Sequence, residues 1–496
     1  MTARCARRVN RFPLPAQRAT TRLRHSPSSG KRSALFASAA LTLTLLLLAG
    51  CSRANGTSLD PVEQEAEDAL VAYLRIDTSN PPGNESAGAV YLRDLLQKNG
   101  IAAQLVGSDP ARQGVYARLE SGTNEKALLL LSHIDVVPAE PQFWRNPPFA
   151  AVREGGYIWG RGALDIKSLT IAHAFALLDL KRRGVKLRRD VVFLAVPDEE
   201  LGGLKGTKQL LDTRPELFEG VGYAMNEGGA NETAVDRVIF WGIEVQQKVP
   251  LWLRVTCEGA GGHGAIPPED GGAPVKLARV LTSIAAIETP YRLDPSIGRT
   301  FAAAAAARTD GRAAKLRLIR EPLDIARIER ELPPGYRALL RDSIAITHID
   351  AGNAVNVMPT RAVAGIDIRL LPSSSPEEML ARVRAAVGKA GQVDVLLQSE
   401  PAAESPASGE LWDAIARQMR AASPGSTVGP LVTAGTTDSR FLRARGITAY
   451  GVMPFKVNYY DAEGVHGHDE RIRARFFAEG VRVTRGIVRD FVAAER

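Results

Sequence analysis

The sequence predicts an α/β catalytic domain with a mostly parallel sheet covered by helices, and a ferredoxin-like α+β domain inserted into it. Three apolar runs, at residues 127–131, 191–196 and 221–225, alternate with helix-like stretches, which is typical of buried parallel strands joined by helices. From about residue 247 the order becomes strand, helix, two strands, helix, strand, which indicates a βαββαβ unit. The α/β pattern resumes near residue 409, so we expect a catalytic domain in two segments with the smaller domain between them.

These changes of pattern predict the domain boundaries. Ala-rich and charged helical sequence at residues 300–341 interrupts the βαββαβ pattern, and we interpret it as an elaboration of a lid. The expected segments are a lipoprotein signal (1–50), a tether (51–60), the first part of the catalytic domain (61–246), a lid and dimerisation domain (247–400) and the second part of the catalytic domain (401–496).

The formal net charge of +8 comes from the N-terminal region. Residues 1–50 contain nine Lys or Arg and no acid, which leaves 54 basic against 55 acidic residues in the rest of the chain. A nearly neutral body gives no electrostatic reason to expect a nucleic acid as partner.

The same N-terminal region has the order of an export signal. Lys31 and Arg32 precede an apolar run that ends in Leu48-Ala49-Gly50-Cys51, which resembles a bacterial lipobox. We therefore expect an exported lipoprotein that contacts the membrane only through lipid on Cys51. Ser52 favours the outer membrane, on the periplasmic side, by resemblance to lipoprotein sorting rules. A transmembrane anchor is the alternative, because the apolar run is at the lower edge of spanning length.

Only three cysteines are present, and Cys257 alone would remain unmodified after removal of the signal. A disulfide within the mature chain is then excluded, and any metal site has to consist of histidines and carboxylates.

Such residues follow several of the apolar or Gly-rich segments, where ligands gather at the carboxyl ends of strands. The candidates are His133, Asp135, Asp165, Glu199, Glu200, Glu227 and His466, with His468 as a neighbour. Asp135 is two residues after His133 and is placed to accept the second ring N–H of that histidine. Singly, each has an ordinary structural explanation, such as a helix start or an N-cap. Their joint occurrence makes an oxygen-rich set that suits zinc.

The chain resembles the cocatalytic zinc peptidase family of aminoacylases, carboxypeptidase G, succinyl-diaminopimelate desuccinylase and glycine-X carboxypeptidases. The resemblance covers roughly residues 60–490. It rests on Ser-His-Ile-Asp-Val-Val-Pro (132–138), the segment from Trp144 to Phe149, Gly-Arg-Gly-Ala-Leu-Asp-Ile-Lys (160–167), Asp-Glu-Glu (198–200), Gly-His-Gly-Ala (262–265) and Asn-Ala-Val-Asn-Val-Met-Pro (353–359).

The resemblance implies two Zn²⁺ per subunit, with Co²⁺ or Mn²⁺ as substitutes, and a homodimer. The implied roles are a bridging Asp165, His133 and Glu227 on one ion, Glu200 and His466 on the other, Glu199 as general base, His263 as an oxyanion donor to the partner subunit, Arg369 as the carboxylate-binding residue, and Asn356 and Gly435 in the substrate pocket. His466 is preferred to His468 because the family ligand precedes a glutamate by four residues, here Glu470.

The predicted function is hydrolysis of an amide bond next to a free carboxylate, in N-acyl amino acids or small peptides. In having Glu at position 227, the chain resembles the aminoacylase and glycine-X carboxypeptidase branches, which use Glu at this position. An aminoacylase without a peptide role, and a non-catalytic substrate-binding lipoprotein on the same fold, are the alternatives. An intact Glu199 argues against the second, because a protein that only binds has no need of a base.

Overall fold

The computed structural model describes residues 60–494. The predicted signal, Cys51 and nearly all of the tether lie outside the described residues, so export and lipid anchoring stay predictions. Within the described range, no helix has both the length and the apolar character that crossing a bilayer requires.

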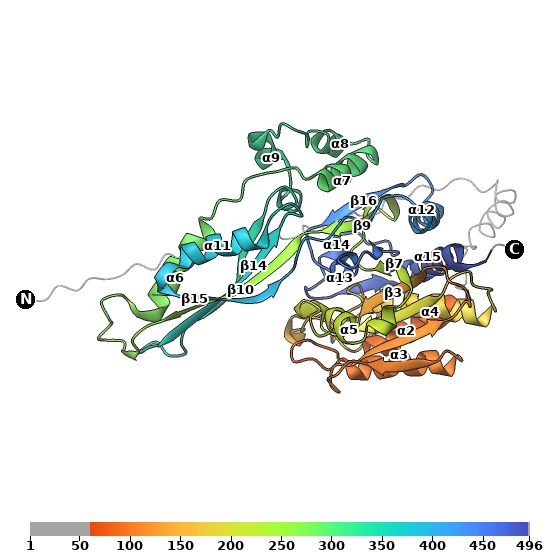
Figure 1. Cartoon of the computed structure of the whole chain (residues 1–496), viewed down its shortest axis with the longest axis horizontal. Helices are drawn as coiled ribbons and strands as arrows, with labels where there is room; N and C mark the ends of the chain where they lie inside the picture. Colours follow the sequence, from red (N-terminus) through yellow and green to blue (C-terminus); the bar gives the residue numbers. More distant parts are fainter. Residues whose placement is uncertain (1–59, 495–496) are drawn as a thin grey trace, which may run out of the picture. The chain divides into compact units, whose positions relative to one another are not determined.

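A central sheet of nine strands carries the catalytic body (Figure 1). Its order is β1-β2-β6-β3-β7-β17-β9-β16, and β8 pairs with β9. The strands are β1 Ala103–Val106, β2 Gly114–Leu119, β3 Ala127–His133, β6 Val191–Val196, β7 Val221–Asn226, β8 Ala230–Ala234, β9 Arg237–Gln247, β16 Thr427–Thr433 and β17 Thr448–Gly451. Neighbours β6, β3, β7 and β17 are parallel, as are β9 and β16, which confirms the predicted mostly parallel sheet.

Helices cover both faces of this sheet, which explains why β3 and β6 are buried along their whole length. Because side chains alternate along a strand, Leu128 and Leu130 pack into one core with α2, α4 and α15, while Leu129 and Leu131 pack into another with α5 and α13. The helices of this body are α2 Pro61–Leu74, α3 Ser86–Lys98, α4 Lys167–Arg182, α5 Thr207–Thr213, α12 Glu410–Ala422, α13 Ser439–Arg443, α14 Tyr459–Ala462 and α15 Ala474–Val492.

A second, antiparallel sheet follows β9 after a single residue, Lys248. Its order is β12-β14-β10-β15, with α6 Gly272–Ala285 and α11 Pro376–Val387 packed on one face (Figure 1). The strands are β10 Val249–Glu258, β12 Ser343–Asp350, β14 Arg361–Leu370 and β15 Gln392–Gln398. The element order is the predicted βαββαβ. Two small sheets pair β11 Gly262–His263 with β13 Val357–Met358, and β4 Val152–Glu154 with β5 Tyr157–Trp159 and β18 Arg471–Arg473.

Four short helices stand between α6 and β12: α7 Pro295–Ala306, α8 Gly311–Leu316, α9 Ile325–Glu331 and α10 Pro334–Ala338. The segment is helical, as predicted, but it packs on the catalytic body. Ile297 and Phe301 of α7 share a core with Phe240 of β9 and Val432 of β16. We call α7–α10 the inserted helices; they lie at the β16 edge of the central sheet (Figure 1).

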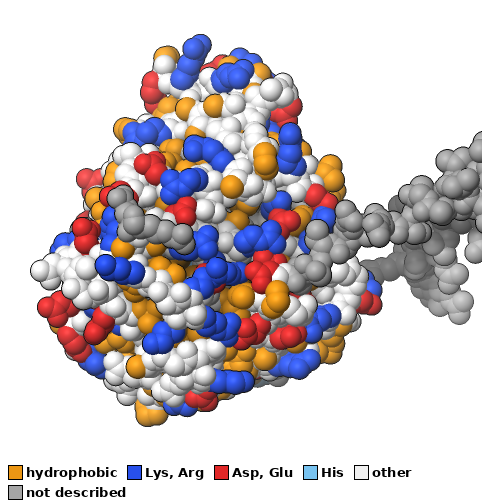
Figure 2. All heavy atoms as spheres, turned by 90° about the vertical axis from the view of Figure 1, so that its right-hand side faces the viewer, with side chains coloured by type: hydrophobic (Ala, Val, Ile, Leu, Met, Phe, Trp, Pro, Cys, Tyr) orange, Lys and Arg blue, Asp and Glu red, His pale blue; other side chains and the backbone are white. Residues whose placement is uncertain are grey.

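Charged side chains of both signs are mixed with apolar ones over the face drawn in Figure 2. No continuous basic surface covers that face, in keeping with the near-neutral body of the chain.

Candidate dinuclear metal centre

The candidate residues converge at the carboxyl ends of three parallel strands. His133 is the last residue of β3, and Glu227 directly follows β7. Glu199 and Glu200 lie in a 3₁₀ turn, Glu199–Leu201, shortly after β6. Ligand sites of open α/β sheets form at this end of the strands.

Two groups of three side chains share Asp165. His133, Asp165 and Glu227 form one group, and Asp165, Glu200 and His466 form the other; within each group the potential ligand atoms lie within 4.8 Å of one another. Nε2 of His133 is 3.2 Å from Oδ1 of Asp165, while Nε2 of His466 is 3.2 Å from Oδ2 of the same carboxylate. Asp165 therefore presents one oxygen to each group, the geometry of a bridging ligand.

The electrostatics of the cluster fit cations in these positions. Burial raises the pKa of the Glu199 and Glu227 carboxyls well above their usual range, and the charges of nearby carboxylates add to the effect. Burial also opposes ionisation of Asp165, yet hydrogen bonds from His133 and His466 lower its pKa overall. Oε1 of Glu199 and Oε1 of Glu200 are buried without a hydrogen-bond partner among the described residues. Imidazoles and crowded carboxylates of this kind are the ligands of zinc, so the residues fit two such ions.

His133 is oriented by the backbone. Its Nδ1–H donates to the carbonyl oxygen of Asp135 at 2.8 Å, which leaves Nε2 for a metal. We predicted that the Asp135 carboxylate would accept this proton, but its Oδ1 is 3.7 Å from Nδ1. The two carboxylate oxygens instead accept from the amides of Glu199 and Glu200, at 3.1 Å each, and from Nδ2 of Asn80 at 2.9 Å. Asp135 therefore fixes the turn that carries both glutamates.

Glu470 has a role that the sequence analysis missed. This fully buried carboxylate accepts from the backbone amides of Gly162, Leu164 and Asp165, at 2.7–3.0 Å, and from Nη1 of Arg161 at 2.7 Å. It thereby orients the loop that carries Asp165. In the sequence analysis Glu470 served only to distinguish His466 from His468. The available signal for its role was the Gly-rich loop at residues 160–167, whose backbone amides need a hydrogen-bond acceptor.

His466 is positioned by an unusual backbone. Its φ of 57° lies in the left-handed region, which costs free energy for a residue with a side chain. The ring lies between two carboxylates, because its Nε2 is 3.1 Å from Oε2 of Glu200 as well as close to Asp165. Hydrogen bonding to Asp165 and Glu200 raises the pKa of His466 to about 10. The strained conformation therefore directs the ring to the place where positive charge is favoured.

Four predicted substrate residues stay outside this cluster. His263 is exposed on β11, where its Nδ1 accepts from the amide of Ala265. Asn356 and Gly435 lie in exposed loop positions, and Nε of Arg369 on β14 donates to Asp367 at 2.8 Å. In the described range, no hydrogen bond or ion pair joins any of the four to a metal ligand, so their roles stay predictions.

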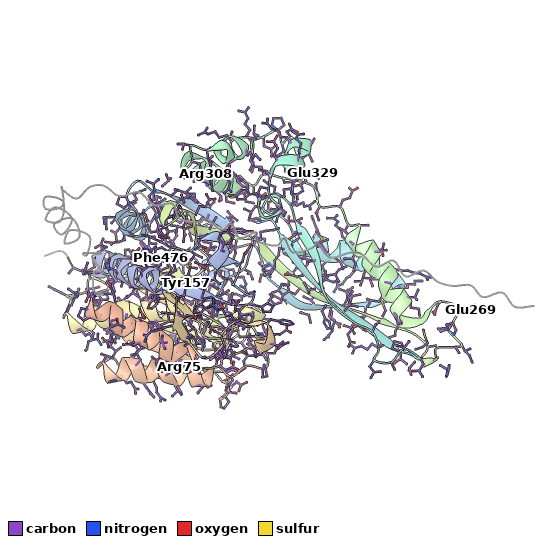
Figure 3. The ribbon with its side chains drawn as sticks, turned by 180° about the vertical axis from the view of Figure 1, so that it is seen from behind. Arg75, Tyr157, Glu269, Arg308, Glu329 and Phe476 are labelled. Carbon is purple, nitrogen blue, oxygen red and sulfur yellow. The ribbon has the colours of Figure 1, made fainter. Side chains whose placement is uncertain are left out.

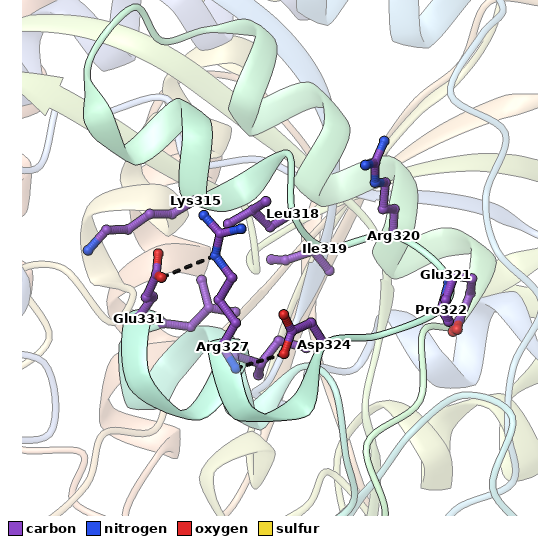
Figure 4. A pocket seen from close by; sticks show the side chains of 11 residues that line it. Lys315, Leu318, Ile319, Arg320, Glu321, Pro322, Asp324, Arg327 and Glu331 are labelled. Carbon is purple, nitrogen blue, oxygen red and sulfur yellow. Dashed lines mark hydrogen bonds and ion pairs between the residues drawn. The ribbon is translucent and has the colours of Figure 1, made fainter.

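A cavity of about 280 Å³ within the inserted helices has no part in this centre (Figure 4). Its wall contains Arg327, whose Nε is 3.1 Å from Oε1 of Glu331 and whose amide donates to Asp324. None of its lining residues is a neighbour in sequence of a predicted metal ligand.

Comparisons with known proteins agree with this geometry. The family model described as Peptidase family M20/M25/M40 matches residues 129–490. The chain is 30% identical to aminoacylase-1 of Sus scrofa over 422 residues, which are 82% of this chain and 91% of the relative. It is 29% identical over 354 residues to the N-fatty-acyl-amino acid synthase/hydrolase PM20D1 of Xenopus tropicalis, covering 69% and 68% of the two chains.

Among solved structures, the fold is similar to an M20 family metallo-carboxypeptidase from Sulfolobus solfataricus. The TM-score is 0.69 at 18% identity, and the match covers 86% of this chain and 99% of the other. The region matched by the family model, residues 129–490, contains all members of the two candidate metal-binding groups and Glu199. The protein is therefore a hydrolase that belongs to peptidase family M20.

Proposed function

We propose that the protein is a zinc-dependent amide hydrolase that cleaves N-acyl amino acids or small peptides on the amino side of a residue with a free carboxylate. The observation that carries the proposal is the pair of metal-binding groups that share Asp165, with the buried Glu199 beside them but in neither group. The names of the two sequence relatives favour N-acyl amino acids as the first substrates to test.

Zinc bound in the two groups would supply Lewis acidity and lower the pKa of a water molecule toward neutrality. Glu199 is suited to accept a proton and return it to the leaving amine, because its Oε1 has no partner among the described residues. Asp135 accepts from the backbone amide of Glu199 and so fixes the turn that carries the Glu199 side chain. Arg369 is proposed to bind the substrate carboxylate and align the amide.

Removal of metal is expected to abolish hydrolysis reversibly. The protein would be treated with a chelator, and N-acetyl amino acids, longer N-acyl amino acids and dipeptides would be assayed before and after adding Zn²⁺, Co²⁺ or Mn²⁺. Because each group presents imidazole and carboxylate ligands, added zinc should restore the rate. Unchanged hydrolysis by metal-free protein would refute zinc dependence. Tight substrate binding without hydrolysis by zinc-loaded protein would support the non-catalytic binding lipoprotein instead.

We further propose that a homodimer completes the site. His263 is exposed on β11, in the small sheet with β13, and has no described contact to the candidate metal ligands of its own chain. Equimolar mixing of inactive His263→Ala with inactive Glu199→Ala is then expected to regenerate about a quarter of the wild-type rate, since half of the dimers would be mixed and one of the two sites in each would have both groups. Confirmed subunit exchange without recovery of activity would exclude action in trans.

A further inference from the structure

The turn that carries Glu199 and Glu200 has a strained backbone. Asp198, the residue before the turn, has a φ of 76°, while Gly202 and Gly203 after it have φ values of 99° and 65°. Glycine adopts this left-handed region freely, whereas an aspartate in the same region costs free energy. The turn therefore keeps this conformation only if other contacts hold Asp198.

Asp198 is held by backbone amides and by one arginine. Its carbonyl oxygen accepts from the amide of Gly203 at 2.6 Å, and its Oδ2 accepts from the amide of Lys205 at 2.8 Å. Its Oδ1 is 2.8 Å from Nη2 of Arg112, in the loop between β1 and β2. The side chains of Asp198 and Arg112 are only 5% and 7% exposed, so solvent and salt screen this ion pair little.

Arg112 is itself fixed by the segment that joins α2 to α3. Arg75, the first residue of this segment, is labelled in Figure 3. Glu85, its last residue, is fully buried and accepts from Nη2 of Arg112 at 2.6 Å and from Nε at 3.2 Å. Gly83 leaves room for the guanidinium, because a Cβ at this position would be 2.6 Å from Nε of Arg112. The guanidinium is thus placed between two buried carboxylates.

The same segment supports the turn by a second route. Nδ2 of Asn80 donates to the carboxylate of Asp135, which accepts from two amides of the turn. The segment therefore reaches the turn through Asp135 and, separately, through Arg112 and Asp198. Neither Arg112 nor Asp198 belongs to a candidate metal-binding group, so their contact acts on the position of the turn.

We propose that Arg112 is a positioning residue, which acts through Asp198 to hold the turn in the conformation that places Glu199 and Glu200 at the metal centre. The kinetic part of this inference rests on the proposed function, whereas the ordering of the turn does not. A loosened turn should slow hydrolysis, because a catalytic group is effective only within a narrow range of geometries. The guanidinium matters because the ammonium group of lysine cannot reproduce its planar set of donors.

Arg112→Lys is expected to lower kcat by about tenfold, with KM within about twofold of wild type, for an N-acyl amino acid that the zinc-loaded enzyme hydrolyses. The variant keeps a positive charge beside the two buried carboxylates, which limits its effect on folding. Arg118→Lys is the matched control. Nη2 of Arg118 is 2.7 Å from Oδ2 of Asp190, at the opposite end of β6, so the same chemical change is made far from the turn. Its kcat should stay within about twofold of wild type.

Asp198→Asn breaks the same contact from the other side. Asparagine tolerates a positive φ and leaves Arg112 paired with Glu85, so we expect this variant to fold even if Arg112→Lys does not. Its kcat should fall by a similar factor. The double variant should lose little more than either single variant, because both changes remove one interaction. Losses that multiply in the double variant would show that Arg112 does not act through Asp198.

Hydrogen exchange gives a measurement that does not depend on hydrolysis. The amides of residues 199–205 are expected to exchange about tenfold faster in Arg112→Lys and Asp198→Asn, with and without added Zn²⁺, and to be unchanged in Arg118→Lys. Unchanged exchange in the first two variants, or a higher KM in place of a lower kcat, would overturn the positioning role. Faster exchange in a protein that hydrolyses none of the substrates would support that role and overturn only the proposed function.

Discussion

Glu199→Gln is expected to lower kcat by on the order of 10²-fold or more while both metal ions and the KM are retained. The Glu199 side chain belongs to neither metal-binding group, and it is 8% exposed at the carboxyl end of β6. Glutamine has nearly the same shape and can accept the same hydrogen bonds, but it cannot take up a proton. The measurement is steady-state kinetics together with zinc content by elemental analysis.

Glu200→Gln is the matched control, because it makes the same chemical change at the next residue. Oε2 of Glu200 is 3.1 Å from Nε2 of His466, so the substitution should weaken zinc at that group and reduce the content toward one ion per chain. Loss of zinc from Glu199→Gln with retention by Glu200→Gln would reverse the two roles. Retention of zinc and near-normal rates by both would show that neither glutamate takes part in catalysis.

Asp165→Asn is expected to have the largest effect on metal content. The two oxygens of Asp165 face His133 and His466 at 3.2 Å each, and an amide replaces one of them with a donor that repels a cation. Zinc should be depleted at both groups, and kcat/KM should fall by on the order of 10³-fold or more, since several kcal/mol of stabilisation depend on the metal.

Asp469→Asn is the corresponding control. Asp469 is close to His466 in the sequence and has a positive φ of 58°, which asparagine tolerates, but it belongs to neither metal-binding group. This variant should keep both ions and most of the activity. Two bound zinc ions in Asp165→Asn would show that this residue does not bridge them.

The sequence was sufficient to predict those strands and candidate site residues whose signal lies in a short, continuous stretch of the chain. The apolar runs that became β3, β6 and β7 could be recognised because both faces of each strand are buried, and the ligands stand directly after them. The contacts of Asp135 could not be predicted, because they depend on a turn that is 64 residues away in the sequence. The docking of Phe301 against Phe240 and Val432 is equally non-local, so the sequence could not predict where the inserted helices pack.

The contact of Glu470 with the loop of Asp165 has a consequence for how the centre is assembled during synthesis. The two residues are 305 positions apart, and His466 belongs to the same late segment. A nascent chain that ends before this segment lacks one candidate metal ligand, His466, and also lacks the carboxylate that accepts from the amides of the loop around Asp165. Tight metal binding and hydrolytic activity are therefore expected only after residues 466–470 have been made.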